Sequence, residues 1–282
     1  MRKLNLTKQV FMILVFSVMA FSCSENEPLE IESQIDDSTE VALSAEIDLA
    51  SEALDEIAID AYETQEASEN PTGRTAGVET FPLPECVTVT VVAEQNSREI
   101  TIDFGDGCEV RGHTLKGKVL LSYIRDPEAR EILITKSFED FFFNNKSIEG
   151  GKTILRERSN GNGNPQFTKT IDITVTWPDG SEASRNGAKI REWVEGHGSG
   201  VWSDNVFEVS GNWTTTFRNG VVHSKEVIIP LRREVICRFF VSGSIDVNKT
   251  NRVGTLDYGN GDCDNQATFT FEDGTVRDIT LR

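Results

Sequence analysis

The sequence is poor in the residues from which catalytic and metal sites are most often built. It has only three histidines, His113, His197 and His223, and they share no spacing typical of zinc ligands. The segment Gly196–Gly200 reads Gly-His-Gly-Ser-Gly, but Ser199 is fourth in it, whereas the nucleophile elbow of serine hydrolases places its serine third. We therefore expect neither an enzyme nor a bound cofactor, and an unrecognised hydrolase is the last alternative.

Basic clusters are also missing. The chain of 282 residues has a net charge of -18, and residues 24–80 carry 17 acids against Arg74 alone. Nothing in such a chain supplies the clustered phosphate contacts that nucleic-acid binding needs, so we exclude that class of function.

Long apolar runs are scarce, because the one clear example, Val10–Ala20, is too short for a comfortable membrane span. Arg2, Lys3 and Lys8 precede it, and a small residue, Ser22, stands immediately before the first cysteine. This order predicts a lipoprotein signal peptide over residues 1–22, which is removed by processing. The new N-terminus, Cys23, would then carry acyl chains such as palmitate and anchor the protein to the outer membrane.

The five cysteines support this interpretation, since an odd number leaves a spare thiol in an exported protein. Lipidation of Cys23 leaves four cysteines, which allow three pairings. Hairpin geometry favours one of them, because Cys86 and Cys108 flank one predicted hairpin and Cys237 and Cys263 flank another. We expect two disulfides with this pairing.

The N-terminal part of the mature chain has three predicted segments. Residues 23–40 are acidic and without periodicity, which is typical of a disordered tether. Residues 41–63 form an amphipathic helix, and residues 64–84, rich in proline and glycine, form a linker. The apolar stripe of the helix docks on the following domain or pairs with another chain as a coiled coil. The stripe consists of Leu43, Ile47, Ala50, Leu54, Ile57 and Ala61, and the acids of the opposite face are Glu46, Asp48, Glu52, Asp55, Glu56 and Asp60.

From residue 85 to residue 282 the hydrophobic period changes to two. Ile171, Ile173 and Val175 alternate with polar residues, as do the apolar residues of 207–217, and glycine- or asparagine-containing turns separate such runs. The pattern predicts an all-β domain, an antiparallel meander of roughly a dozen strands that closes as a barrel-like roll or folds into a sandwich.

All four tryptophans fall between residues 177 and 213. Trp177 and Trp213 share strand parity with apolar residues, which places them in the core. Trp193 shares parity with Lys189 and Arg191, and Trp202 is opposite in parity to Phe207. Trp193 and Trp202 are therefore the candidates for an exposed surface that binds a glycan or another ligand.

Acid-rich turns raise the possibility of calcium binding, because they place carboxylates beside flexible glycines. Neither turn has the ligand spacing of an EF-hand, and the favoured interpretation is that the carboxylates accept hydrogen bonds from the turn backbone. The calcium candidates are Asp103, Asp106, Asp257, Asp262 and Asp264.

Two elements of this domain are alike: Asp103–Gly107 reads Asp-Phe-Gly-Asp-Gly and is followed by Cys108, and Asp257–Gly261 reads Asp-Tyr-Gly-Asn-Gly and is followed, after Asp262, by Cys263. With the strand Val206–Gly211 and the segment Asp262–Asn265, they resemble a family of Bacteroidota lipoproteins. The resemblance covers about residues 84 to 282 and implies an architecture without an activity. Cys23–Glu27 is similar to the acidic signal for surface export in such lipoproteins, but Asn26 interrupts it, so surface and periplasmic display both remain open.

The sequence thus predicts a lipid-anchored protein of the cell envelope with a non-catalytic structural or binding role. The alternative is a module that recognises a glycan or an envelope protein at the cell surface. The expected partners are the membrane, through the lipid, and a glycan or envelope protein, while the sequence leaves the oligomeric state open.

Overall fold

The computed structural model describes residues 29–69, 83–249 and 252–281. The chain divides into two compact units, Met1–Ala42 and Leu43–Arg282. The predicted signal peptide and lipidation site lie outside the described residues. Among the described residues, no helix combines the length and the apolar character that crossing a membrane requires.

The helix α1 is longer than its periodicity predicts, because it covers Leu29–Glu69 and not residues 41–63 alone. Residues 29–40, expected as a disordered tether, and residues 64–69, expected as a linker, are helical. The sequence offers a reason, since no glycine or proline occurs within α1, whereas Pro28 precedes it and Pro71 follows it closely. The second half of α1 belongs to the same unit as the strands.

The described residues form one antiparallel sheet of 14 strands, which pair in chain order except that the short β3 lies off this path and pairs with β4. This confirms the predicted all-β meander. The sheet does not close into a barrel, because β1 and β14 stand at opposite ends of the strand order. The strands are β1 Thr88–Glu94, β2 Ser97–Asp103, β3 Cys108–Val110, β4 His113–Ile124, β5 Glu131–Phe143, β6 Lys146–Glu157, β7 Gln166–Thr176, β8 Glu182–Glu195, β9 Val206–Phe217, β10 Val222–Glu234, β11 Ser242–Lys249, β12 Arg252–Asn260, β13 Gln266–Phe271 and β14 Val276–Thr280.

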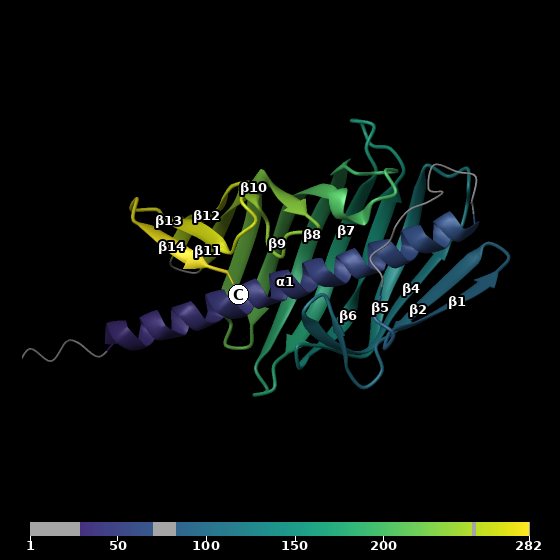
Figure 1. Cartoon of the computed structure of the whole chain (residues 1–282). Coiled ribbons are helices and arrows are strands. Elements are labelled where there is room, and N and C mark those ends of the chain that lie inside the picture. Colours follow the sequence, from purple (N-terminus) through teal and green to yellow (C-terminus); the bar gives the residue numbers. More distant parts are fainter. Residues whose placement is uncertain (1–28, 70–82, 250–251, 282) are drawn as a thin grey trace, which may run out of the picture. The chain divides into compact units, whose positions relative to one another are not determined.

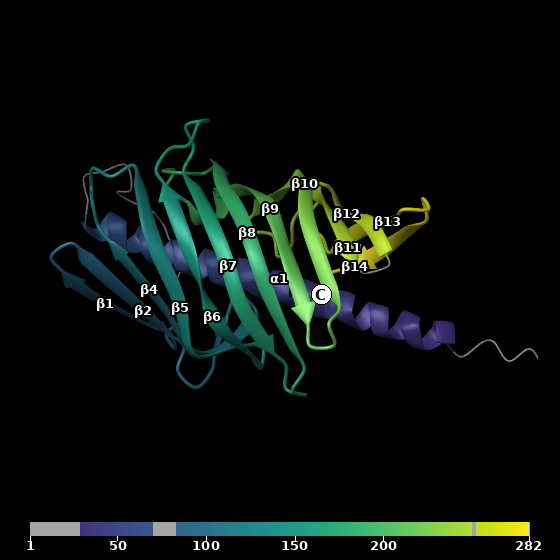
Figure 2. The ribbon, with the colours of Figure 1, turned by 180° about the vertical axis from the view of Figure 1, so that it is seen from behind.

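Residues 43–69 of α1 lie across one face of the sheet, as the views from the two sides show (Figures 1 and 2). We call this the inner face and the opposite one the outer face. The apolar stripe of the helix is buried against the inner face, where Ile47, Leu54 and Ile57 are at most 2% exposed and share a core with strand residues. Of the two interpretations of the stripe, the structure therefore contains the first, docking on the β domain.

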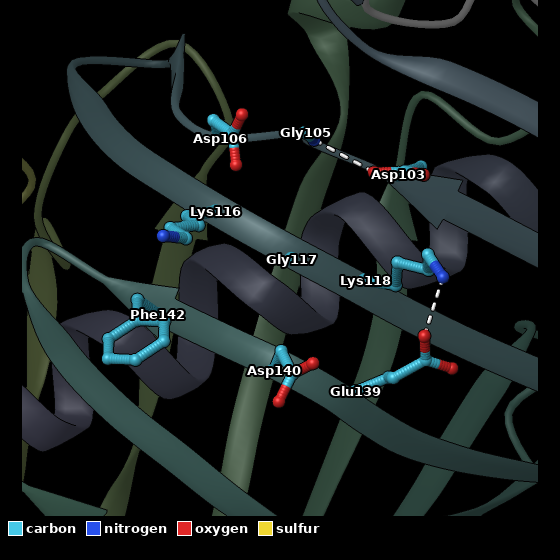
Figure 3. Close-up of a pocket in the computed structure, with 9 residues that line it drawn as sticks. All are labelled: Asp103, Gly105, Asp106, Lys116, Gly117, Lys118, Glu139, Asp140 and Phe142. Carbon is cyan, nitrogen blue, oxygen red and sulfur yellow. Dashed lines mark hydrogen bonds and ion pairs between the residues drawn. The ribbon is translucent and has the colours of Figure 1, made fainter.

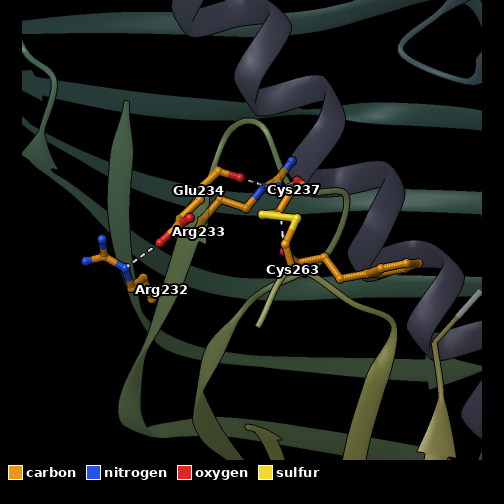
Figure 4. Close-up of a disulfide and its surroundings, with 6 residues drawn as sticks. Arg232, Arg233, Glu234, Cys237 and Cys263 are labelled. Atoms are coloured by element: carbon orange, nitrogen blue, oxygen red, sulfur yellow. Dashed lines mark hydrogen bonds and ion pairs between the residues drawn. A yellow bond between two sulfur atoms is a disulfide. The ribbon is translucent and has the colours of Figure 1, made fainter. Parts of the chain in front are cut away.

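Both predicted disulfides are present with the predicted pairing. Cys86 pairs with Cys108 across a Cα–Cα distance of 5.8 Å, and Cys237 pairs with Cys263 across 5.4 Å. Each disulfide lies at the open end of a hairpin, beyond the last paired residues of its two strands. The first closes the β1–β2 hairpin and the second closes the β11–β12 hairpin. Figure 4 shows the second disulfide beside Arg233, whose Nε lies 2.8 Å from Oε1 of Glu56 on α1.

Candidate functional site: a charged inner face and a hydroxyl-rich outer face

The inner face carries bases at positions where an antiparallel sheet normally places apolar side chains. In β5, for example, Lys136 continues the series Ile132 and Ile134, and in β7 Lys169 stands between Phe167 and Ile171, all of them buried. The acids of α1 lie directly against these bases. We call the following set the ionic layer: Asp48, Glu52, Asp55 and Glu56 of α1 with Lys136, Lys152, Lys169, Arg185, Lys189, Arg191, Lys225 and Arg233 of the strands.

Asp55 is the centre of the ionic layer. Its carboxylate accepts hydrogen bonds from Lys136 Nζ at 2.5 Å, from Lys152 Nζ at 3.3 Å and from Lys169 Nζ at 2.9 Å. The three lysines come from the neighbouring strands β5, β6 and β7, and all four side chains are 0% exposed. Three bases thus share one anion in a buried site, where removal of the anion leaves buried positive charge without compensation.

The neighbouring acids of α1 bridge the more C-terminal strands. Glu52 accepts from Lys189 Nζ at 2.7 Å and lies 3.4 Å from an Arg191 nitrogen, both in β8. Arg191 also reaches Glu56, at 3.3 Å, which Arg233 of β10 approaches to 2.8 Å. These contacts join acids one turn apart on α1 to strands that are two positions apart in the sheet.

Further ion pairs continue the interface towards both ends of the docked half of α1. At one end Asp48 pairs with Arg185 NH1 at 2.7 Å and with Lys225. At the other end Glu63 accepts from Arg156 Nε at 2.7 Å and Glu69 from Arg98 Nε at 2.6 Å. Asp60, Glu66 and Glu46 pair with Arg111, Arg125 and Lys146 respectively.

The electrostatics follow from two competing effects, burial and charge pairing. Burial disfavours the charged form of Glu52, but Lys189, Lys169 and Arg191 outweigh it and lower its pKa to about 2. For Lys152 the effect of burial exceeds the attraction of Asp55. Burial and the neighbouring lysines together lower the pKa of Lys152 to about 7. The ionic layer contains eight bases and four acids, so positive charge is in excess where Lys152 lies.

The outer face has a different chemistry. Thr135, Thr153 and Thr170 stand side by side on β5, β6 and β7, and the hydroxyls of the last two are in contact. A second row pairs Asp172 with Asn186, and Asn186 with Thr214. These side chains are exposed or half-buried, and neighbouring rows are offset by two residues along each strand. We call these six residues, Thr135, Thr153, Thr170, Asp172, Asn186 and Thr214, the hydroxyl patch.

The structure corrects the expectation for Trp193. Its side chain is 6% exposed and packs against Phe207 with ring centroids 5.2 Å apart, so it belongs to the core. Its strand parity with Lys189 and Arg191 predicts exposure, but those two bases are themselves buried because Glu52 of α1 pairs with them. Trp177 and Trp213 are buried, as predicted.

Trp202 lies in the short 3₁₀ helix Trp202–Asp204 and is half-buried. The guanidinium of Arg111 lies 5.3 Å from its ring centroid, a geometry typical of a cation–π contact. Trp202 also packs against the core that contains Trp193. The structure therefore brings the two candidates close to one core and not together on an exposed aromatic surface.

Three of the five calcium candidates accept hydrogen bonds from the turn backbone, as turn chemistry favours. Asp103 Oδ1 accepts from the backbone N–H of Gly105 at 2.8 Å, Asp257 from Gly259 and Asp264 from Gln266, both also at 2.8 Å. Within the described part of the chain, no three acidic, histidine or cysteine side chains come together as a metal site would need. The carboxylates of Asp103, Asp257 and Asp264 act as caps of their turns.

A shallow pocket of about 460 Å³ lies on the β4–β5 side of the first acidic turn (Figure 3). Asp103, Asp106 and Asp140 line it together with Lys118, which pairs with Glu139 at 2.5 Å, and Lys116 lies over the ring of Phe142. At its rim Lys118 and Glu139 form a partly exposed ion pair, and the floor is the backbone of a β-bulge. The pocket offers polar contacts but little enclosed surface.

The three histidines stay apart in the structure. His113 lies against Phe143, His197 against Trp193 and His223 against Phe217. Burial, together with Arg238, lowers the pKa of His113 to about 4, so its imidazole is neutral at physiological pH. Ser199 Oγ donates to Asp204 Oδ1 at 3.0 Å.

The ionic layer is the feature that sequence reasoning missed. The signal was present in two parts: lysine and arginine at core parity in several strands, and a helix with acids of one sign around its apolar stripe. Each part alone reads as a solvated surface, and only their combination indicates a buried interface. Comparison with protein-family models, with curated proteins and with solved structures gives no match to this chain.

Proposed function

We propose that the protein is a lipid-anchored binding protein of the cell envelope, with a non-catalytic role. The observation that carries this proposal is that the two faces of the sheet differ, because one is covered by α1 and the other is open to solvent. The inner face is filled by α1, whereas the outer face presents the hydroxyl patch to solvent. Hydroxyl, amide and carboxylate groups at regular spacing are suited to hydrogen bonding with a hydroxyl-rich ligand, so the binding class that we propose is an envelope glycan.

The ionic layer supports the proposal because it joins the segment behind the anchor to the domain that binds. Cys23 precedes α1 in the sequence. Residues 43–69 of α1 form ion pairs with six strands, β2, β5, β6, β7, β8 and β10, and share an apolar core with the sheet. Separation of this half-helix from the sheet would expose its apolar stripe and the core of the inner face to water, which disfavours separation. Attachment through several acyl chains would give stable anchoring, which a single chain does not.

The anchoring is tested by fractionation of cells that express the protein or its Cys23→Ser variant. We expect the wild type in the membrane fraction and Cys23→Ser in the soluble fraction. The Ser24→Ala variant is the matched control and should stay with the membrane. Membrane association of Cys23→Ser would contradict lipid anchoring at this residue.

The binding role is tested with purified full-length protein on an array of bacterial envelope glycans. Thr153→Lys together with Asn186→Lys places two ammonium groups in the middle of the hydroxyl patch and should abolish any glycan signal. Glu131→Lys, at the exposed start of β5 outside the patch, is the control and should keep it. A signal that survives the double substitution, or the lack of any signal for the wild type, would contradict glycan binding by this face.

A further inference from the structure

The edge strand β1 is unusual in the described part of the chain because no residue of it is covered. All seven residues, Thr88–Glu94, are exposed, including Val89 at 44%, Val91 at 37% and Val92 at 48%. β1 pairs with β2 on one side only and ends the strand order. Exposed backbone and apolar side chains thus meet along one edge of the sheet.

Natural sheets normally protect such an edge with lysine, proline, a bulge or a very short strand. β1 has none of these devices: its sequence is Thr-Val-Thr-Val-Val-Ala-Glu, and its register with β2 runs without a shift over all seven pairs. The strand at the other end, β14, has only five residues and carries Arg277 and Asp278 in its middle. The difference between the two ends indicates that the β1 edge is kept available for pairing.

The hairpin geometry fixes which backbone groups point outward. β1 and β2 are joined by the two-residue turn Gln95–Asn96, so Glu94 and Ser97 form the closing, hydrogen-bonded pair. Alternate residues of β1 then direct their N–H and C=O groups to β2, and the others, Val89, Val91 and Ala93, direct theirs away from it. The side chains of these three residues share the inner face with Ile100 and Ile102.

We propose that the β1 edge is a self-association site, at which β1 of a second copy of this chain pairs antiparallel about a two-fold axis at Val91. In this register Val91 faces its own counterpart, Val89 faces Ala93, and Thr88 faces Glu94. About six backbone hydrogen bonds form between the outward groups of the two strands. The apolar inner-face residues of both copies become one continuous row.

Charge favours a second copy over a foreign strand as the occupant. The only charged residue of β1, Glu94, lies at its end, opposite Thr88 of the other copy, so the two-fold register brings no like charges together. The apolar Val89, Val91 and Ala93 are symmetrically placed about the centre, which makes the strand complementary to itself. A single strand pair buries little area, so the contact is of the transient class.

The test measures the mass of the full chain in mild detergent by sedimentation over a range of concentrations. We expect the wild type to dimerise and Val91→Lys to weaken dimerisation at least about tenfold, because two introduced ammonium groups would face each other at the axis. Val276→Lys, on the exposed start of β14, is the matched control and should dimerise like the wild type. At concentrations too low for dimerisation the melting temperature should be the same for all three proteins, since both positions are exposed.

A second variant keeps the result independent of introduced charge. Val91→Pro removes an N–H group that points away from β2, so the hairpin remains while the edge loses its central donor. It should be monomeric with an unchanged melting temperature. A wild type that stays monomeric up to millimolar concentration, or a Val91→Lys protein that dimerises as well as the wild type, would overturn the proposal. Dimerisation lost only in Val276→Lys would overturn it as well, by assigning the contact to β14.

Discussion

Substitution of Asp55 by asparagine tests the ionic layer most directly. The change keeps the shape of the side chain but removes the one negative charge shared by Lys136, Lys152 and Lys169, all four side chains being 0% exposed. Breaking a buried ion pair typically costs about 3–5 kcal/mol, because the remaining charge stays buried without compensation. We expect Asp55→Asn to lower the free energy of unfolding by about this amount.

A second route gives a similar figure. Lys152, whose pKa is about 7, is already partly neutral in the wild type. Without Asp55 a second lysine must also lose its proton to escape the cost of a buried charge, and that loss at pH 7 costs about 5 kcal/mol for a group that ordinarily titrates near 10.4. The folded variant therefore binds fewer protons than its unfolded state below that pH. Its stability should recover as the pH rises towards 10, where the unfolded state loses these protons too.

The assay is urea denaturation of the full chain in mild detergent at pH 7 and pH 9.5. Glu139→Gln is the control, because it breaks the Lys118–Glu139 pair, whose side chains are 35% and 52% exposed, and should cost less than about 1 kcal/mol. Asp55→Asn combined with Lys152→Met should lose less stability than Asp55→Asn alone, since one stranded charge is gone. An Asp55→Asn protein as stable as Glu139→Gln at pH 7 would refute the reasoning.

Three further outcomes are expected. The pKa of Lys152 in the folded protein, about 7, lies below its value in the unfolded chain, so the unfolded state binds more protons between pH 7 and pH 10. The free energy of unfolding of the wild type should therefore rise over this range by up to about 1.4 kcal/mol per pH unit. Lys152→Met should flatten this slope in urea titrations at several pH values. Gly117 has φ +80°, and a Cβ added there would clash with the backbone of Asp140. Gly117→Ala should therefore lower the free energy of unfolding by about 1–3 kcal/mol, measured by thermal melts. An unchanged melting temperature would contradict the bulge geometry. Replacing Cys86 and Cys108 together by alanine should cost about 3 kcal/mol relative to the oxidised wild type in urea denaturation, and this difference must disappear when both proteins are reduced.

The sequence alone determined the architecture of the β domain. Period-two alternation, as in Ile171, Ile173 and Val175, depends only on local backbone geometry, so it predicted antiparallel strands that the structure contains. The disulfide pairing followed equally locally, because each pair of cysteines flanks one hairpin. The docking of the apolar stripe of α1 was one of two interpretations, and the hydrophobic period had no means of choosing between them.

Only the tertiary structure decided which charged residues are buried. Lys169 and Asp55 are 114 residues apart in sequence and meet in a site without solvent, where each makes the burial of the other tolerable. The sequence around either residue does not show that the other will lie beside it. For the same reason the prediction that Trp193 is exposed was wrong, because the sequence did not show that the bases of its strand are buried. The lack of closure into a barrel, and with it the free edge of β1, is likewise a property of the whole sheet, because local alternation fixes the faces of a strand but not where the sheet ends.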